Sequence, residues 1–305
     1  MPLFGVMTRT TRTRGGLRAP IQRPWLPLAL AGLASPLAPS PSTAQVPGRR
    51  GDESAVIWRS QEGRWRSPMR SGLPEARGGF VFCRLWYDQV RSMPSGLGWS
   101  TDYPAADGNF LTRLEELTPI HISRWKNGEP GIAAMRATDP DIYQCPFLFM
   151  TDPGSVRFSQ AETEGLRDYL MKGGFLWADD LWGEQAWRYF EEEIRLILPE
   201  FPIVEIEPGH PLLSNYYMVP EIPQIPSIQS WRRSGGRTSE FGFETAVPHI
   251  RAIFDHDGRL LVAISYNTDI ADGWEREADE PEFFYNFSPE AYGVAINILF
   301  WAMSH

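Results

Sequence analysis

Two adjacent aspartates, Asp179 and Asp180, end a short apolar run within the segment LMKGGFLWADDLWGEQ, residues 170–185. The glycine pair before the run is typical of a helix end, and the run itself is typical of a buried strand. A carboxylate at the tip of a strand can transfer protons, ligate a metal or cap the next helix. We expect Asp180 to cap the helix that follows and Asp179 to face a pocket at the end of the sheet.

The pattern of elements around these aspartates predicts an α/β protein. Strand and helix patterns alternate from residue 80 to residue 207, which indicates a mostly parallel sheet with helices on both faces. The predicted strands of this stretch are 80–87, 120–125, 142–152, 175–179 and 203–207, and the predicted helices are 109–118, 159–174 and 184–199. Asn109 is expected to cap the first of these helices, and Ser159 with Glu162 predicts a capping box on the second.

The last part of the chain adds a hairpin and a helix to this prediction. Asp257-Gly258 is a hairpin signal between two further strand patterns, so those strands are expected to be antiparallel neighbours. Residues 288–305 predict a closing helix, with Ser288 as its cap and Pro289 at its first position.

Polar residues that follow the predicted strands form the candidate site, because open parallel sheets bind ligands beyond the carboxyl ends of their strands. The resulting rim is acidic and aromatic, and converging carboxylates can hold a divalent cation or share a proton. Its members are Tyr87, Asp88, Asp152, Asp179, Asp180, Trp182, Asn267, Asp269, Trp274 and Glu275. Structural roles compete with this interpretation, since Asp152 stands before Pro153-Gly154 as in an ordinary turn.

Recognised catalytic and cofactor motifs are absent from the sequence. It has no H-x-x-x-H pair and no cysteine cluster, so no zinc site is indicated, and we expect no metal and no cofactor. It also has no G-x-S-x-G, no P-loop and no G-x-G-x-x-G. Local support for Ser/His/Asp catalysis is therefore missing, and no catalytic residue is assigned.

The first 44 residues have the composition of a secretory signal peptide. Five arginines precede or flank the apolar run WLPLALAGLASPLA, and a small-residue segment ends at Ala44. We expect cleavage after Ala44, a flexible lead-in over 45–78 and one domain over 79–305, placed in the periplasm or outside the cell. The apolar run has about 14 residues against the roughly 20 that a membrane span needs, so no span is expected after cleavage.

The charge balance limits the partners of the exported chain. The sequence has 29 basic and 38 acidic residues, and the five arginines before residue 44 are lost with the signal peptide. The remaining 24 basic and 38 acidic residues give a net charge of −14. Nucleic acid is excluded as a partner, because phosphate binding needs a basic surface; a carbohydrate or an envelope protein assembly stays open.

Cys83 and Cys145 are the two cysteines of the chain. An oxidising compartment would permit a disulfide between them. Both lie in or beside predicted strands, and bridges between neighbouring strands of a parallel sheet are geometrically awkward. We therefore favour two buried free thiols over a disulfide, and neither cysteine has the neighbours of an activated nucleophile.

Several segments together resemble the bacterial family DUF4159. They are FVFCRLWYD, LTRLEELTPI, CPFLFMTDPG, FSQAETEGLRDYLMKGGFLWADD, HPLL and YNTDIADGWE, and they cover about residues 79–305. The resemblance implies a flavodoxin-like fold of the class I glutamine-amidotransferase-like kind, and a role in an envelope-associated assembly. Many members carry a Gly-His pair after the third strand, where this chain has Thr151-Asp152-Pro153-Gly154, so no histidine role is carried over.

The same resemblance argues against glutaminase chemistry. Amidotransferases of this fold place a cysteine after the strand that follows the glycine pair, and here that segment reads FLWADDLWGEQ. Two functions stay open. The first is a non-catalytic binding or scaffold module, which we favour. The second is a carboxylate-dependent, metal-assisted or metal-free hydrolase acting on a carbohydrate through Asp179 and Asp180. Adjacent residues at a strand end point opposite ways, so Asp152 or Glu275 would have to be the partner.

Overall fold

The structure is a computed structural model that describes residues 58–59, 65–66, 73–74, 78–94 and 96–304. The expected signal peptide, 1–44, and most of the expected lead-in lie outside the described residues. Within the lead-in, β1 (Trp58–Arg59) pairs with β2 (Trp65–Arg66) in antiparallel fashion.

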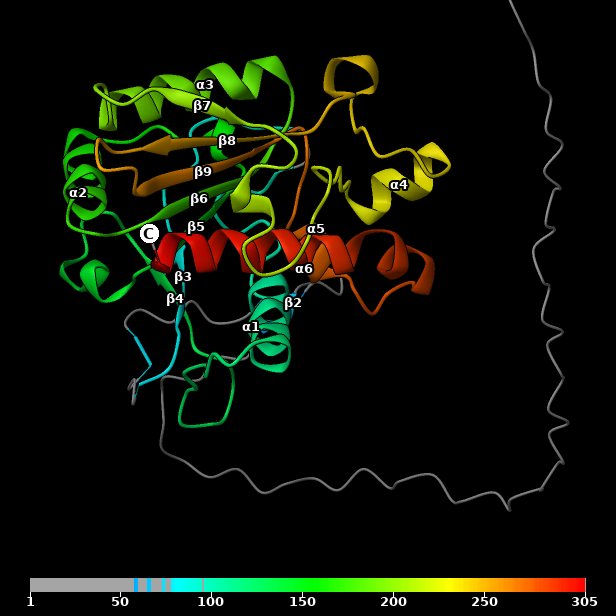
Figure 1. The fold of residues 1–305 in the computed structure, drawn as a ribbon, viewed down its shortest axis with the longest axis horizontal. Helices are drawn as coiled ribbons and strands as arrows, with labels where there is room; N and C mark the ends of the chain where they lie inside the picture. Colours follow the sequence, from blue (N-terminus) through cyan, green and yellow to red (C-terminus); the bar gives the residue numbers. More distant parts are fainter. Residues whose placement is uncertain (1–57, 60–64, 67–72, 75–77, 95, 305) are drawn as a thin grey trace, which may run out of the picture. The chain divides into compact units, whose positions relative to one another are not determined.

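A seven-stranded, mostly parallel sheet forms the centre of the domain (Figure 1). Its strands lie in the order β4-β3-β5-β6-β9-β8-β7. Neighbours from β4 to β9 are parallel, whereas β8 is antiparallel to both β9 and β7. The strands are β3 (Phe82–Leu85), β4 (Ile132–Met135), β5 (Leu148–Thr151), β6 (Leu176–Leu181), β7 (Ile203–Ile206), β8 (His249–Phe254) and β9 (Leu260–Tyr266).

Helices cover both faces of this sheet, as the sequence predicted. The longer helices are α1 (Ala105–Leu117), α2 (Gln160–Met171), α3 (Gly183–Ile197) and α6 (Pro281–Ser304), and the shorter ones are α4 (Ile228–Ser234) and α5 (Asp272–Glu275). One core packs α1 and α6 against one face of the sheet, which includes Trp177. The other packs α2 and α3 against the opposite face, which includes the next strand residue, Leu176. Successive strand residues thus enter opposite cores, which explains the unbroken apolar runs.

Most of the predicted elements are confirmed, including the capping box of Ser159 and Glu162 and the antiparallel pairing of β8 with β9. Two predictions for the first part of the domain are wrong. Residues 120–125 form only isolated bridges, and β4 takes the place of the second strand. Helix α1 begins at Ala105, so Asn109 is internal and its amide donates to the carbonyl oxygen of Trp274 at 2.7 Å.

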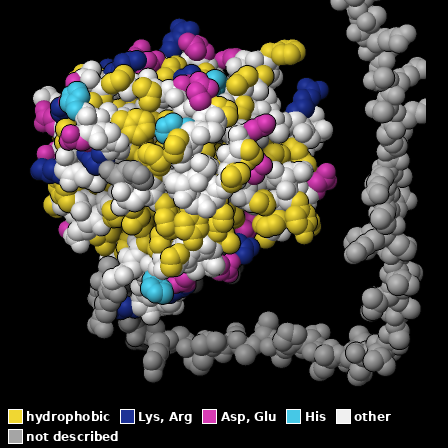
Figure 2. Space-filling view, in the orientation of Figure 1, with side chains coloured by type: hydrophobic (Ala, Val, Ile, Leu, Met, Phe, Trp, Pro, Cys, Tyr) yellow, Lys and Arg dark blue, Asp and Glu magenta, His cyan; other side chains and the backbone are white. Residues whose placement is uncertain are grey.

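The closing helix also begins earlier than predicted. Helix α6 starts at Pro281, which places Ser288 and Pro289 inside it. The rule that proline favours the first helical position holds, but it applies to Pro281. Figure 2 shows hydrophobic side chains gathered on the molecular surface, in the view where α6 lies in front.

Cys83 and Cys145 form a disulfide, so the expectation of two free thiols is wrong. Cys145 does not continue a strand; it follows the 3-10 helix at Pro140–Gln144 and stands before β5 begins. That position lets its side chain approach β3 with a Cα–Cα distance of 5.9 Å, which lies within the usual range for disulfides. The two cysteines therefore do not lie on neighbouring parallel strands, and the geometric obstacle to a bridge is absent.

Among the described residues, no helix has the length and apolar character required to cross a bilayer.

Candidate functional site

The carboxyl ends of β5, β6 and β9 carry sharp backbone turns. Four non-glycine residues of the described chain have a positive φ, and all four are Asp or Asn: Asp102 at 62°, Asp152 at 49°, Asp180 at 61° and Asn267 at 57°. Three of them directly follow or lie within these strand ends. Asp and Asn tolerate the left-handed region better than other side chains, and such conformations cluster at functional sites.

Asp179 is a structural anchor and does not face a pocket, contrary to our expectation. Its carboxylate accepts hydrogen bonds from the backbone N–H groups of Ile270, at 3.2 Å, and Ala271, at 2.9 Å. The residue is fully buried, and burial raises the pKa of its carboxyl to about 6 against the lowering effect of these hydrogen bonds. Asp179 thereby fixes the chain that leads into α5. Its carboxylate is not available as the catalytic group of the hydrolase scheme.

Asp180 occupies the place expected for Asp179. It does not cap α3, whose N-cap position is Trp182 and has no side-chain cap. Instead Asn267 and Glu244 accept from the first two N–H groups of the helix, those of Gly183 and Glu184, at 3.0 and 3.2 Å. Asp180 is 6% exposed, and burial followed by the nearby charge of Asp152 raises the pKa of its carboxyl well above the usual value.

A small pocket lies over Asp180, and we call it the acidic pocket. Its lining residues are Met93, Pro94, Asp152, Asp180, Trp182, Ala186 and Phe241. The Trp182 and Phe241 rings meet edge to face, with centroids 6.3 Å apart. Two carboxyl groups thus share a pocket with two aromatic rings. The enclosed space is about 10 Å³, which is room for one water-sized polar group.

Asp152 enters the acidic pocket from the turn after β5. Its Oδ2 accepts a hydrogen bond from the N–H of Gly98 at 2.9 Å, and burial raises the pKa of its carboxyl to about 6. Gly96 packs so closely on this carboxylate that a Cβ at that position would lie 2.1 Å from it. The turn predicted at Asp152 exists, but its side chain also serves the site.

Arg84 fastens the loop that crosses the site. Its guanidinium is fully buried and pairs with Asp107, with Nε 3.1 Å from Oδ2. It also donates to the carbonyl oxygens of Thr101 at 2.6 Å and Trp99 at 3.2 Å, and to the hydroxyl of Thr151 at 2.9 Å. The loop that leads into α1 is thereby tied to β3 and β5, and this loop carries Asp102.

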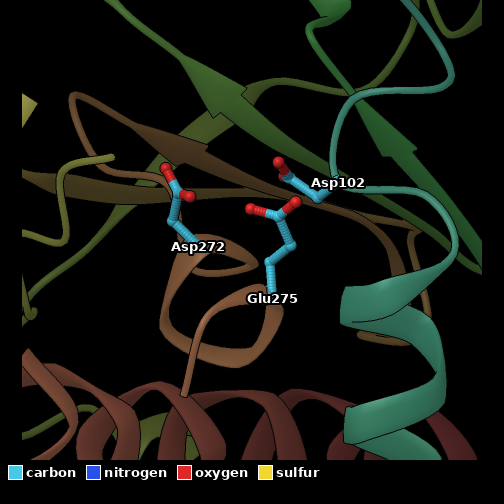
Figure 3. Close-up of side chains that lie close together, drawn as sticks. All are labelled: Asp102, Asp272 and Glu275. Carbon is cyan, nitrogen blue, oxygen red and sulfur yellow. The ribbon is translucent and has the colours of Figure 1, made fainter. Parts of the chain in front are cut away.

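Asp102, Asp272 and Glu275 form a second acidic group, which we call the acidic triad (Figure 3). Each contributes a carboxylate oxygen, and these oxygens all lie within 4.8 Å of one another. Burial, followed by the charge of Glu275, raises the pKa of Asp272 to about 8. Burial, followed by the charge of Asp272, raises the pKa of Asp102 well above the usual value. Close carboxyl groups of this kind can share a proton or ligate a cation.

Asp269 connects the acidic triad to β9. Its Oδ1 accepts from the N–H of Asp272 at 3.1 Å, and burial with the nearby Asp272 charge raises the pKa of its carboxyl well above the usual value. Glu275 receives a hydrogen bond from Arg276, Nε to Oε2, at 2.8 Å. Both residues were expected at the rim; the structure places Asp269 shortly after β9 and Glu275 at the end of α5.

The other expected rim residues have structural roles. Tyr87 is buried, and its hydroxyl donates to the carbonyl oxygen of Thr151 at 2.7 Å. Asp88 is 73% exposed and pairs with Arg136. Asn267 joins the start of α3 to the carbonyl oxygen of Val247. Trp274 is fully buried in the aromatic core, with its ring centroid 4.8 Å from that of Phe110.

Comparison with known families agrees with the resemblance carried by the sequence. The model of the family described as domain of unknown function, DUF4159, matches residues 82–303. The chain belongs to the DUF4159 family. No curated protein matches it. The DUF4159 match begins at the first residue of β3 and ends inside α6, so the acidic pocket and the acidic triad both belong to the family domain.

Two residues of this DUF4159 site were missed by sequence reasoning, Asp102 and Asp272. Asp102 lies in a long loop before α1, and no local pattern predicted that Arg84 would draw this loop over the sheet. Asp272 had a readable signal, because Asp269, Asp272 and Glu275 are spaced three residues apart. Residues at that spacing share one face of a helical turn.

Proposed function

We propose that this DUF4159 chain is an exported binding domain whose ligand site is the acidic pocket. The observation that carries the proposal is the convergence of two buried carboxyl groups, Asp152 and Asp180, with the aromatic rings of Trp182 and Phe241. Carboxyl oxygens bond sugar hydroxyls, and aromatic rings pack against the apolar faces of sugars. A carbohydrate is therefore the ligand class we propose, with one hydroxyl group entering the enclosed space of about 10 Å³ and the rest of the sugar lying outside it.

One feature, the disulfide, supports both export and the absence of glutaminase chemistry. The disulfide between Cys83 and Cys145 fits an oxidising compartment such as the periplasm or the cell exterior. It also occupies both cysteines of the chain, so no thiolate remains to attack an amide.

The proposed finer fold is flavodoxin-like, of the glutamine-amidotransferase-like kind. Numbered along the chain, the five mutually parallel strands follow the order 2-1-3-4-5 across the sheet, which is the flavodoxin-like order. The acidic pocket lies at the carboxyl ends of these strands, where such sheets bind ligands.

A carboxylate-dependent carbohydrate hydrolase is the second candidate. It is favoured by one observation, that the carboxyl groups of Asp152 and Asp180 have raised pKa values beside a pocket. A carboxyl group that holds its proton near neutral pH can act as a general acid. This scheme replaces the earlier one that relied on Asp179.

The test is thermal unfolding of the purified protein with chito-oligosaccharides and cello-oligosaccharides, because a ligand that binds the native state raises the melting temperature. We expect a concentration-dependent rise for wild type that Asp180→Asn loses. Asp257→Asn is the matched control, since Asp257 lies exposed in the β8–β9 turn. Release of reducing ends in the same mixtures would select the hydrolase, and the absence of any shift with either glycan series would refute the carbohydrate proposal.

A further inference from the structure

The acidic triad contains a carboxylate oxygen that lacks the partner its burial requires. Oδ2 of Asp102 is buried from solvent and accepts no hydrogen bond from the described chain. A buried carboxylate oxygen without a donor is costly, so such an atom calls for a bound group that the protein itself does not supply. This observation is independent of the gathering of acidic residues.

The surroundings of this oxygen favour a cation as the missing group. Asp272 is 5% exposed, and its carboxylate and that of Glu275 lie within 4.8 Å of the Asp102 carboxylate. A hydrogen-bond acceptor placed there would add repulsion, whereas a cation would attract all three groups. Figure 3 shows the three side chains converging from two parts of the chain, the loop before α1 and the short helix α5.

We propose that Asp102, Asp272 and Glu275 bind one Ca²⁺ ion. The donors are all carboxylate oxygens, the ligands that hard divalent cations prefer, and the triad includes neither histidine nor cysteine. Two oxygens bound to the same Ca²⁺ at 2.3–2.6 Å can be at most about 5 Å apart, and for Mg²⁺ at 2.0–2.1 Å at most about 4.2 Å. The three carboxylate oxygens lie within 4.8 Å of one another, inside the limit for Ca²⁺. The flexible coordination of Ca²⁺ also suits three protein carboxylates better than the near-ideal octahedral geometry that Mg²⁺ demands.

The charge of the triad matches a divalent ion. The guanidinium of Arg276 binds Oε2 of Glu275 at 2.8 Å, which leaves the other carboxylate oxygen of Glu275 for the metal. Three carboxylates with one guanidinium carry a net charge of −2 when ionised, and Arg276 also pairs with Asp279 at 3.2 Å, so the triad keeps enough negative charge to attract a divalent cation. Open coordination positions would be filled by water, as is usual for Ca²⁺.

This inference rests on the proposed function in one respect, that the carboxyl edge of the sheet is the binding face. The test of the Ca²⁺ site uses the metal alone. Tb³⁺ replaces Ca²⁺ at oxygen sites and emits when a nearby tryptophan is excited, and Trp274 lies in α5 between Asp272 and Glu275. We expect sensitised emission that saturates at one Tb³⁺ per chain and is displaced by Ca²⁺. Calorimetry with Ca²⁺ alone should give the same stoichiometry.

Matched variants separate the site from general acidic attraction. Asp102→Asn and Asp272→Asn should each weaken Tb³⁺ binding at least about tenfold, while Asp257→Asn at the opposite end of β9 should leave it unchanged. Near-ultraviolet circular dichroism checks that each variant is folded. No saturable binding by wild type in either measurement, or equal binding by Asp102→Asn and wild type, would overturn the inference. Metal binding without any oligosaccharide shift would retain the Ca²⁺ site and refute the carbohydrate proposal. An oligosaccharide shift without metal binding would refute the Ca²⁺ site and retain the carbohydrate proposal.

Discussion

Asp179 and Asp180 are adjacent in the sequence, yet their carboxylates serve opposite purposes. The carboxylate of Asp179 accepts the backbone N–H groups of Ile270 and Ala271. That of Asp180 lines the acidic pocket near Asp152. The left-handed backbone of Asp180, with φ of 61°, separates the two directions at the end of β6.

This difference predicts different effects of a substitution at each aspartate. Asp179→Ala leaves two buried N–H donors without an acceptor, so the free energy of unfolding should fall by about 2–4 kcal/mol. Asp180→Asn keeps a side chain that tolerates the left-handed backbone but removes a buried charge that repels other carboxylates, so stability should rise or change by less than about 1 kcal/mol. Urea denaturation of both variants checks this, and an equal loss from the two would contradict the assigned roles.

Removing only one partner of the buried ion pair between Arg84 and Asp107 should strongly lower the stability of the protein. Arg84→Met leaves the Asp107 carboxylate buried without a cation, and the expected loss is about 3–5 kcal/mol of unfolding free energy. Arg84→Met with Asp107→Leu should recover much of that loss, because no lone charge is left. The exposed pair of Arg188 and Glu184 provides the control, and its removal should change stability by less than about 1 kcal/mol. A small effect of Arg84→Met alone would show that the pair is not desolvated.

The disulfide should contribute strongly to stability. Cys83 and Cys145 are 62 residues apart, and a loop of that size corresponds to a stabilisation of about 4 kcal/mol in the chain-entropy account. Reduction should therefore lower the denaturation midpoint of the wild-type protein. The variant with both cysteines replaced by alanine should start from the lower midpoint and should not respond to reductant. If reductant also lowered the midpoint of that variant, the loss of stability would not come from the disulfide.

Stability should rise when the pH is lowered from about 7.5 to about 5. The carboxyl groups of Asp152 and Asp179 have pKa values of about 6 in the folded protein, against about 3.9 in an unfolded chain. Between these values the folded state binds more protons than the unfolded state, so stability falls as pH rises through this window. Asp152→Asn removes one titrating group and should flatten the slope measured by denaturation at several pH values. An unchanged slope would contradict the assigned pKa of Asp152.

The sequence predicted the elements whose signals are local. The capping box of Ser159 and Glu162, the hairpin at Asp257-Gly258 and the apolar runs of the parallel strands all depend on neighbouring residues. The second strand was misplaced because IHISRW has an apolar alternation, although β4 at Ile132–Met135 carries the pairing to β3. Tertiary pairing there overrides a local pattern.

The candidate site stays a prediction, but the structure changes the contacts expected for Asp179 and Asp180. Of the predicted residues, Asp152, Asp180 and Trp182 line the acidic pocket, and Asp269 and Glu275 lie at the acidic triad. The direction of each aspartate depends on φ values that a sequence does not specify, and Asp179 finds its partners about ninety residues further along the chain. The same limit applies to Asp102, since Arg84 holds its loop through a contact with Thr101.

Arg84 and Asp179 hold the two halves of the acidic triad independently, one through the loop before α1 and the other through the start of α5. Both halves are therefore in place before a ligand arrives. A ligand entering such a site loses little of its binding free energy to ordering the protein, and its association is not slowed by a folding step. We accordingly expect capture at this edge to be fast, with affinity set by how slowly the ligand leaves.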